Sequence, residues 1–176
     1  WLAGMPSLLI GREREMAELR CLLELAQTGS GQVALITGEA GIGKSRLVEE
    51  LRAEGQRRFP KTRWLVGRCQ EMGISTHFWM VRDMLHTLFG LTPATDRAER
   101  ILSFTQGFVD SGIMTLAQRA QLLPVLVHLT GVKLGDLWDS RFDDEEPEAV
   151  RSHLLQGIQR FFQAMARQGP LALIFE

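Results

Sequence analysis

Long apolar runs, cysteine and an excess of either charge are all scarce in this sequence. Its longest apolar runs, such as LLPVLV, are far shorter than the roughly 20 residues of a membrane-spanning helix. Two cysteines are too few for a disulfide framework and favour a reducing, cytoplasmic setting. A formal net charge of -1 lacks the basic excess typical of nucleic-acid-binding segments. We therefore expect no membrane insertion and no direct binding of nucleic acid.

Both ends of the sequence indicate a piece of a longer protein. The chain opens on Trp1 rather than Met, and WLAGMPS lacks the basic and apolar regions of a signal peptide. At the other end, PLALIFE stops inside what we expect to be a buried strand. The 176 residues, 45% of them hydrophobic, suffice for one or at most two domains with a proper core.

Hydrophobic periodicity predicts an α/β chain in which helices outnumber strands. Apolar residues recur at helical spacing in six segments, at 13–27, 44–59, about 79–89, 94–109, 116–129 and 147–167. Short continuous apolar runs predict three buried strands, QVALITG at 32–38, TRWLVGRCQ at 62–70 and LALIFE at 171–176. This order predicts a parallel sheet core with a helical insertion, about residues 75–168, between the second and third strands.

The segment GEAGIGKS, residues 38–45, places three glycines between the first predicted strand and the second predicted helix. Gly38, Gly43, Lys44 and Ser45 satisfy G-x-x-x-x-G-K-[ST], the phosphate-binding loop or Walker A motif, in its expected strand-loop-helix context. Several backbone N–H groups must point at phosphate oxygens, which requires unusual backbone angles and no obstructing side chains. The sequence therefore predicts a P-loop NTPase that binds nucleotide.

Each residue type in that motif has a chemical task. The ammonium group of Lys44 can reach the β- and γ-phosphates, the Ser45 hydroxyl can ligate Mg²⁺, and the positive end of the helix attracts the anion. The predicted cofactors are ATP or ADP with Mg²⁺. The predicted nucleotide-binding residues of this segment are Gly38, Glu39, Ala40, Gly41, Ile42, Gly43, Lys44, Ser45 and Arg46.

Four segments, LLIGREREMAEL, GEAGIGKSRLVEEL, VGRC and PLALIFE, make the chain resemble the STAND-type ATPases of the AAA+-like (ASCE) branch. The likeness is closest to the ATPase modules of large LuxR-type transcriptional regulators and of class III adenylate cyclases. It covers essentially all 176 residues and is weakest through the helical insertion. It implies that residues 1–176 are the N-terminal part of an ATPase domain, ending at the Walker B strand.

The resemblance also implies roles for residues outside the loop. Ile10, Gly11 and Arg12 would border the base and ribose; the alternative is that Gly11 is a plain turn and Arg12 a solvated charge. LALIF matches the family's acidic strand, so Glu176 takes its first acidic position as a second Mg²⁺ ligand and, with Lys44, as a catalytic residue. Many relatives carry Asp there, and the acid that follows is absent. We therefore expect this chain by itself to hydrolyse ATP slowly or not at all.

The sequence also gives expectations for residues outside the nucleotide site. Arg68, at the end of the second predicted strand, either reaches toward nucleotide or a neighbouring subunit, or is structural. Cys69 is predicted to be a small core residue. The four histidines show no ligand-like spacing with one another or with the cysteines, which argues against a metal other than Mg²⁺. The acidic DDEE before Pro147 is predicted to be a solvated helix start.

Together these features favour an ATP-binding switch module of a multidomain signalling or transcription-regulatory protein, one that hydrolyses ATP when intact. The expected partners are nucleotide, other domains of the same chain beyond residue 176 and, on activation, a homo-oligomer. Two alternatives remain open: a P-loop phosphotransferase, and an interaction module that holds nucleotide without turnover. The LIGRE segment, and the lack of a guanine-reading N-K-x-D motif, favour adenine over guanine.

Overall fold

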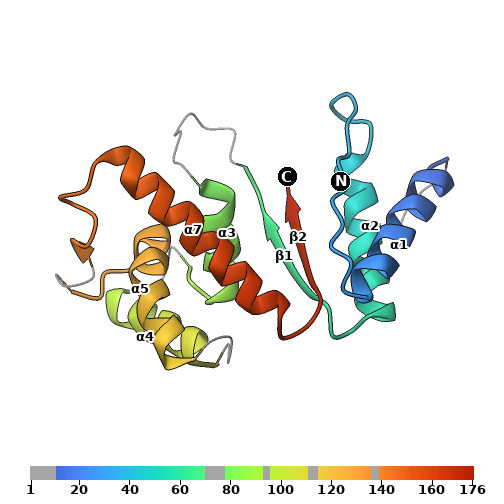
Figure 1. Cartoon of the computed structure of the whole chain (residues 1–176). Helices are drawn as coiled ribbons and strands as arrows, with labels where there is room; N and C mark the ends of the chain where they lie inside the picture. Colours follow the sequence, from blue (N-terminus) through green and yellow to red (C-terminus); the bar gives the residue numbers. More distant parts are fainter. Residues whose placement is uncertain (1–10, 70–77, 93–95, 111–114, 136–138) are drawn as a thin grey trace. The chain divides into compact units, whose positions relative to one another are not determined.

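The structure is a computed structural model that describes residues 11–69, 78–92, 96–110, 115–135 and 139–176 (Figure 1). The chain divides into two compact units, the first ending at Arg63 and the second beginning at Trp64. The elements, in chain order, are α1 (Glu13–Gln27), α2 (Lys44–Arg58), β1 (Arg63–Gly67), α3 (Trp79–Leu88), α4 (Arg97–Asp110), α5 (Leu116–Thr130), α7 (Pro147–Ala166) and β2 (Leu171–Phe175).

The first unit is built on two helices, α1 and α2, which pack side by side (Figure 1). Helix α1 has the predicted bounds, and Met16 on its apolar stripe is buried, as is Leu47 on the facing stripe of α2. Ion pairs join the same two helices: Arg20 meets Glu54 at 2.7 Å, and Arg58 meets Glu24 at 2.6 Å. The two helices are thus held by an apolar seam with charged pairs beside it.

The prediction of a buried strand at residues 32–38 is wrong for this structure. The segment forms no strand, and two of its large apolar side chains are open to solvent, with Val33 95% and Leu35 87% exposed. A strand needs a neighbour to hydrogen-bond with its backbone, and none of the described residues pairs with this segment. The local β-branched pattern was correct evidence of strand propensity, but propensity without a partner forms no sheet.

In the second unit, β1 and β2 form a parallel two-stranded sheet (Figure 1). The ladder continues past β2, because the Glu176 N–H donates to the Gly67 carbonyl at 3.0 Å and its own carbonyl accepts from the Cys69 N–H at 2.6 Å. The predicted strands 62–70 and 171–176 are therefore present in shortened form. The prediction that the last one is buried is wrong: its residues are half-buried and Phe175 is 54% exposed.

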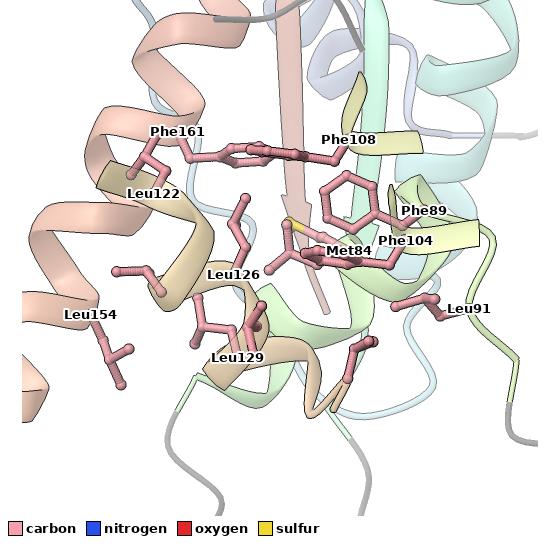
Figure 2. Close-up of a cluster of buried hydrophobic side chains, with 14 of the residues drawn as sticks. Met84, Phe89, Leu91, Phe104, Phe108, Leu122, Leu126, Leu129, Leu154 and Phe161 are labelled. Atoms are coloured by element: carbon pink, nitrogen blue, oxygen red, sulfur yellow. The ribbon is translucent and has the colours of Figure 1, made fainter. Parts of the chain in front are cut away.

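Helices α3, α4, α5 and α7 supply most of the hydrophobic core of the second unit (Figure 2). Phe104 and Met84 are fully buried, and the ring of Phe89 meets that of Phe104 edge-on, with centroids 5.1 Å apart. The predicted apolar stripe of α7 is confirmed, since Leu154, Phe161 and Met165 are buried while Val150 and Ile158 pack against the core. The four helices lie between β1 and β2 in the sequence, as the predicted helical stretch required.

Helix ends follow local chemistry. Helix α4 begins at Arg97, not at Ala94, which lies outside the described residues; the Asp96 carboxylate accepts from the Glu99 N–H at 2.8 Å and so caps that end. Thr115 and Gln118 form a reciprocal capping box at the start of α5. The acidic run before α7 is a helix start as predicted, with Pro147 in the first turn.

Cys69 is not a core residue. It lies two positions beyond the end of β1 and is exposed. The sequence prediction extended the strand to residue 70, whereas β1 ends at Gly67, and beyond it the Cys69 backbone keeps a single hydrogen bond to Glu176. An ideal Cβ at Gly67 would lie 2.3 Å from the Met80 carbonyl oxygen, so only glycine allows α3 to approach the strand this closely.

Candidate functional site

The glycine-rich loop at residues 38–43 has the backbone shape that its motif predicts. Gly41 and Gly43 have φ angles of 79° and 93°, in the left-handed region that favours glycine. Gly38 has a φ of 155°, and a Cβ there would lie 3.1 Å from Ile42 Cγ2. The loop is exposed from Gly38 to Gly43, so its backbone N–H groups can meet a ligand from solvent.

Lys44 closes the loop on itself. Its Nζ donates to the Gly38 carbonyl at 2.9 Å and to the Glu39 carbonyl at 2.8 Å. The ammonium group is therefore held at the mouth of the loop by two neutral acceptors. A phosphate oxygen is a stronger partner for an ammonium than a carbonyl is, because the phosphate carries a negative charge and adds the attraction between opposite charges to the hydrogen bond. The arrangement lets an arriving anion take over the Lys44 contacts.

The N–H groups at the N-terminus of α2 have no side chain of their own helix start as a hydrogen-bond acceptor. Gly43 at the N-cap has no side chain to accept from the first-turn N–H groups. Among the residues of α2, all of which the structure describes, the first turn holds no acid. These N–H groups and the positive end of the helix dipole, equivalent to about half a charge, therefore stay available to a bound anion.

Two other predicted residues of this unit lie in the first turn of α2. Ser45 is exposed, so its hydroxyl can reach a metal ion on a bound phosphate, and one protein oxygen suits Mg²⁺, which keeps several of its waters. Arg46 lies 3.7 Å from Glu50 of the same helix. The residues present thus fit a magnesium-bound phosphate at Ser45, whereas the Arg46 guanidinium has a carboxylate within its own helix.

The GRE segment meets the loop through one side chain. Arg12 Nη2 donates to the Ile42 carbonyl at 3.2 Å, and Nη1 pairs with Glu15 at 2.9 Å. Gly11 has a φ of 79°, and its N–H donates to Glu13 at 3.1 Å. Ile10 lies outside the described residues. The structure therefore brings Arg12 to a backbone carbonyl of the loop, while its place beside the base and ribose stays a prediction.

Glu176 belongs to the second unit, at the carboxyl end of β2. Its carboxylate lies 4.0 Å from the Arg68 guanidinium, and the Arg68 N–H donates to Asp83 at 3.0 Å. The side chain of Arg68 is 67% exposed, so this ion pair contributes little to stability. Arg68 and Glu176 thus meet where two parallel strands end, the edge at which α/β sheets bind ligands.

Two cavities of the second unit lie away from the glycine-rich loop. Two shallow cavities of about 250 and 160 Å³ lie between α5 and α7, and neither is lined by a predicted nucleotide-binding residue. Within the described part of the chain, no three or more His, Cys, Asp or Glu side chains gather as metal ligands do. No helix in that same part has the length and apolar character needed to cross a bilayer.

Sequence reasoning missed the contacts that hold the GRE segment near the loop. The Arg20 guanidinium donates to both carboxylate oxygens of Glu54, at distances of 2.7–2.9 Å. These hydrogen bonds lower the pKa of Glu54. These two residues are 34 positions apart, as are Glu24 and Arg58. No local pattern links residues at that separation, because the pairing depends on how α1 and α2 pack.

The chain belongs to the family of AAA ATPase domains, whose model matches residues 8–176. An uncharacterized protein of Rhizobium meliloti (strain 1021) is 28% identical to it over 169 residues. The match covers 96% of this chain but 15% of that relative, so the chain spans a small part of its relative's length. No solved structure gives a significant match.

The family and the loop agree on the coarse function. A P-loop that opens a helix is the nucleotide-binding element of such domains, and the chain is accordingly a nucleotide-binding domain of the AAA type. Domains of this family typically use ATP or ADP with Mg²⁺. The resemblance predicted this branch of P-loop proteins, and the family match confirms it at that level.

Proposed function

We propose that this chain is the ATP-binding part of a STAND-type switch, in a multidomain protein that regulates signalling or transcription. The observation that carries the proposal is the loop: left-handed glycines at 41 and 43, Lys44 across its mouth and an uncapped helix start behind it. ATP or ADP occupancy would bias how the module packs on other domains.

The roles of the residues follow from their chemistry. Lys44 would exchange its two carbonyl partners for phosphate oxygens, and the N–H groups from Gly41 to Ser45 would surround the same anion. Ser45 would ligate Mg²⁺, which supplies charge neutralisation when bound, and Glu176 is the predicted acid at the end of β2. Glu176 would also orient the attacking water in a protein that hydrolyses ATP, with Arg68 as its neighbour.

Lys44→Ala tests the binding step. The substitution removes a charge-assisted contact worth about 1.5–3 kcal/mol, so the affinity for ATP with Mg²⁺ should fall about 10- to 150-fold. Isothermal calorimetry measures both affinities, and circular dichroism checks that the helices remain. Lys61→Ala is the matched control, because Lys61 is an exposed lysine of the same unit. Equal ATP affinities in wild type and Lys44→Ala would refute the proposal.

We also propose that residues 1–176 are the N-terminal part of the ATPase domain. The support is the exposure of Val33 and Leu35 beside unpaired backbone. A protein extended past residue 176 by about 100 residues, a domain-sized addition, should slow amide exchange at 33–37. Unchanged exchange in the longer protein would contradict this assignment.

A further inference from the structure

Arg12 makes two contacts within the protein, one to the loop backbone and one to a side chain of α1. Its Nη2 donates to the Ile42 carbonyl in the middle of the loop, at 3.2 Å. Its Nη1 pairs at 2.9 Å with Glu15, one turn into α1, and the Arg12 side chain is 31% exposed. The guanidinium group is therefore held between a helix and the backbone of the loop, as its planar fork of donors allows.

The Ile42 carbonyl controls a neighbouring donor through the peptide plane. Among the described residues no peptide bond is cis, so the Ile42 C=O and the Gly43 N–H lie on opposite edges of one rigid plane. Turning the carbonyl toward Arg12 turns the Gly43 N–H away from Arg12. Gly43 is the last residue before α2, where a phosphate-binding N–H is needed.

This plane has little restraint of its own. Gly41 and Gly43, with φ angles of 79° and 93°, flank Ile42, and glycine adopts many backbone conformations at little cost. Lys44 holds the carbonyls of Gly38 and Glu39, at the other end of the loop. When Lys44 turns to a phosphate, those two contacts are given up, whereas the contact of Arg12 with Ile42 can persist.

We propose that Arg12 is a positioning residue of the phosphate loop, which holds the Ile42–Gly43 peptide in the orientation that directs the Gly43 N–H at phosphate. Glu15 fixes the guanidinium group in turn. A hydrogen bond from its own backbone N–H, and then Arg12, lower the pKa of Glu15 below its ordinary value. The inference rests on the proposed function only in that the loop's ligand is a phosphate chain.

Inorganic tripolyphosphate separates this role from contact with the base, because it has the phosphate chain of ATP and no base or ribose. Calorimetry of Arg12→Ala should show the affinities for ATP and for tripolyphosphate, each with Mg²⁺, falling by the same factor of about ten. Arg14→Ala is the control: like Arg12→Ala it removes one positive charge at the start of α1, and the Arg14 side chain is 89% exposed. It should leave both affinities unchanged.

Loss of ATP affinity with unchanged tripolyphosphate affinity would place Arg12 at the base and overturn the proposal. Unchanged affinities for both ligands would overturn it as well. An equal fall in Arg14→Ala would do the same, because net charge would then explain the effect. Failure of the wild type to bind ATP would instead refute the proposed function.

A ligand-free measurement tests the positioning role even in that case. With ¹⁵N-glycine labelling, which limits the spectrum to the 17 glycines of the chain, the order parameter of each glycine amide can be followed. Arg12→Ala should lower the order parameter of Gly43 from about 0.85 to below about 0.6, values typical of rigid and flexible backbone. Gly29, in the turn after α1, is the internal control. An unchanged Gly43 order parameter would overturn the proposal.

Discussion

Gly157 is a position where replacing glycine by alanine in a helix should destabilise the protein. It lies buried within α7, which packs against α5. An ideal Cβ at Gly157 would lie 2.6 Å from Val125 Cγ1, 2.8 Å from Cγ2 and 3.0 Å from Cβ. Val125 is itself 6% exposed, and a β-branched side chain in a helix has one strongly preferred rotamer. The valine therefore cannot rotate out of the way.

Two opposing effects set the magnitude. Alanine is better than glycine in a helix interior by about 1 kcal/mol, which favours the variant. Forcing an extra methyl group into a packed core costs about 1–3 kcal/mol, because neighbouring backbones must separate. At distances below 3 Å the cost should lie in the upper half of that range, so Gly157→Ala should lower the free energy of unfolding by about 1–2 kcal/mol.

Urea unfolding, followed by the fluorescence of Trp64 and Trp79 in the same unit, measures this loss. Gln159→Ala, at an exposed position of the same helix, is the control and should be close to neutral. In a Val125→Ala background most of the clash is gone, so adding Gly157→Ala should become neutral or stabilising, a coupling of at least about 1 kcal/mol. A Gly157→Ala variant with a raised urea midpoint would refute the packing argument.

The remaining predictions concern specificity, pH and the junction of α1 with α2. Unlabelled ATP should displace bound labelled ATP from the wild type at a lower concentration than GTP does. Stronger displacement by GTP would overturn the adenine assignment. Burial lowers the pKa of His86 below its ordinary value of 6.5, so the unfolded chain takes up the proton first as the pH falls. The free energy of unfolding should therefore be fully retained above pH 6.5 and decrease below it, until the lowered pKa of His86 is passed. His86→Gln should flatten this dependence in urea titrations, and an unchanged dependence would contradict the assignment. Glu54→Gln weakens the bidentate contact with Arg20 and should destabilise the first unit by about 1 kcal/mol in thermal unfolding, without changing the urea midpoint of the second unit.

Local patterns in the sequence determined much of this protein. Helix α1 follows from apolar spacing alone, because side chains three and four positions apart share a face whatever packs against it. The loop is contiguous: residues 38–45 contain the glycines, the lysine and the helix start, so the motif predicts its own geometry. The apolar stripe on α7 is of the same kind.

Only the tertiary structure decided the features that need a partner far along the chain. Residues 32–38 have strand propensity, yet strands are completed by backbone hydrogen bonds to another segment, which this one lacks among the described residues. The exposure of Cys69 depended on β1 ending at Gly67, two positions before it. The contact of Arg12 with Ile42 spans 30 positions and that of Arg20 with Glu54 spans 34, so no periodicity could indicate them. The physical reason is common to all of these: a repeating pattern shows which face of an element is apolar, whereas the identity of what lies against that face is set by packing between elements.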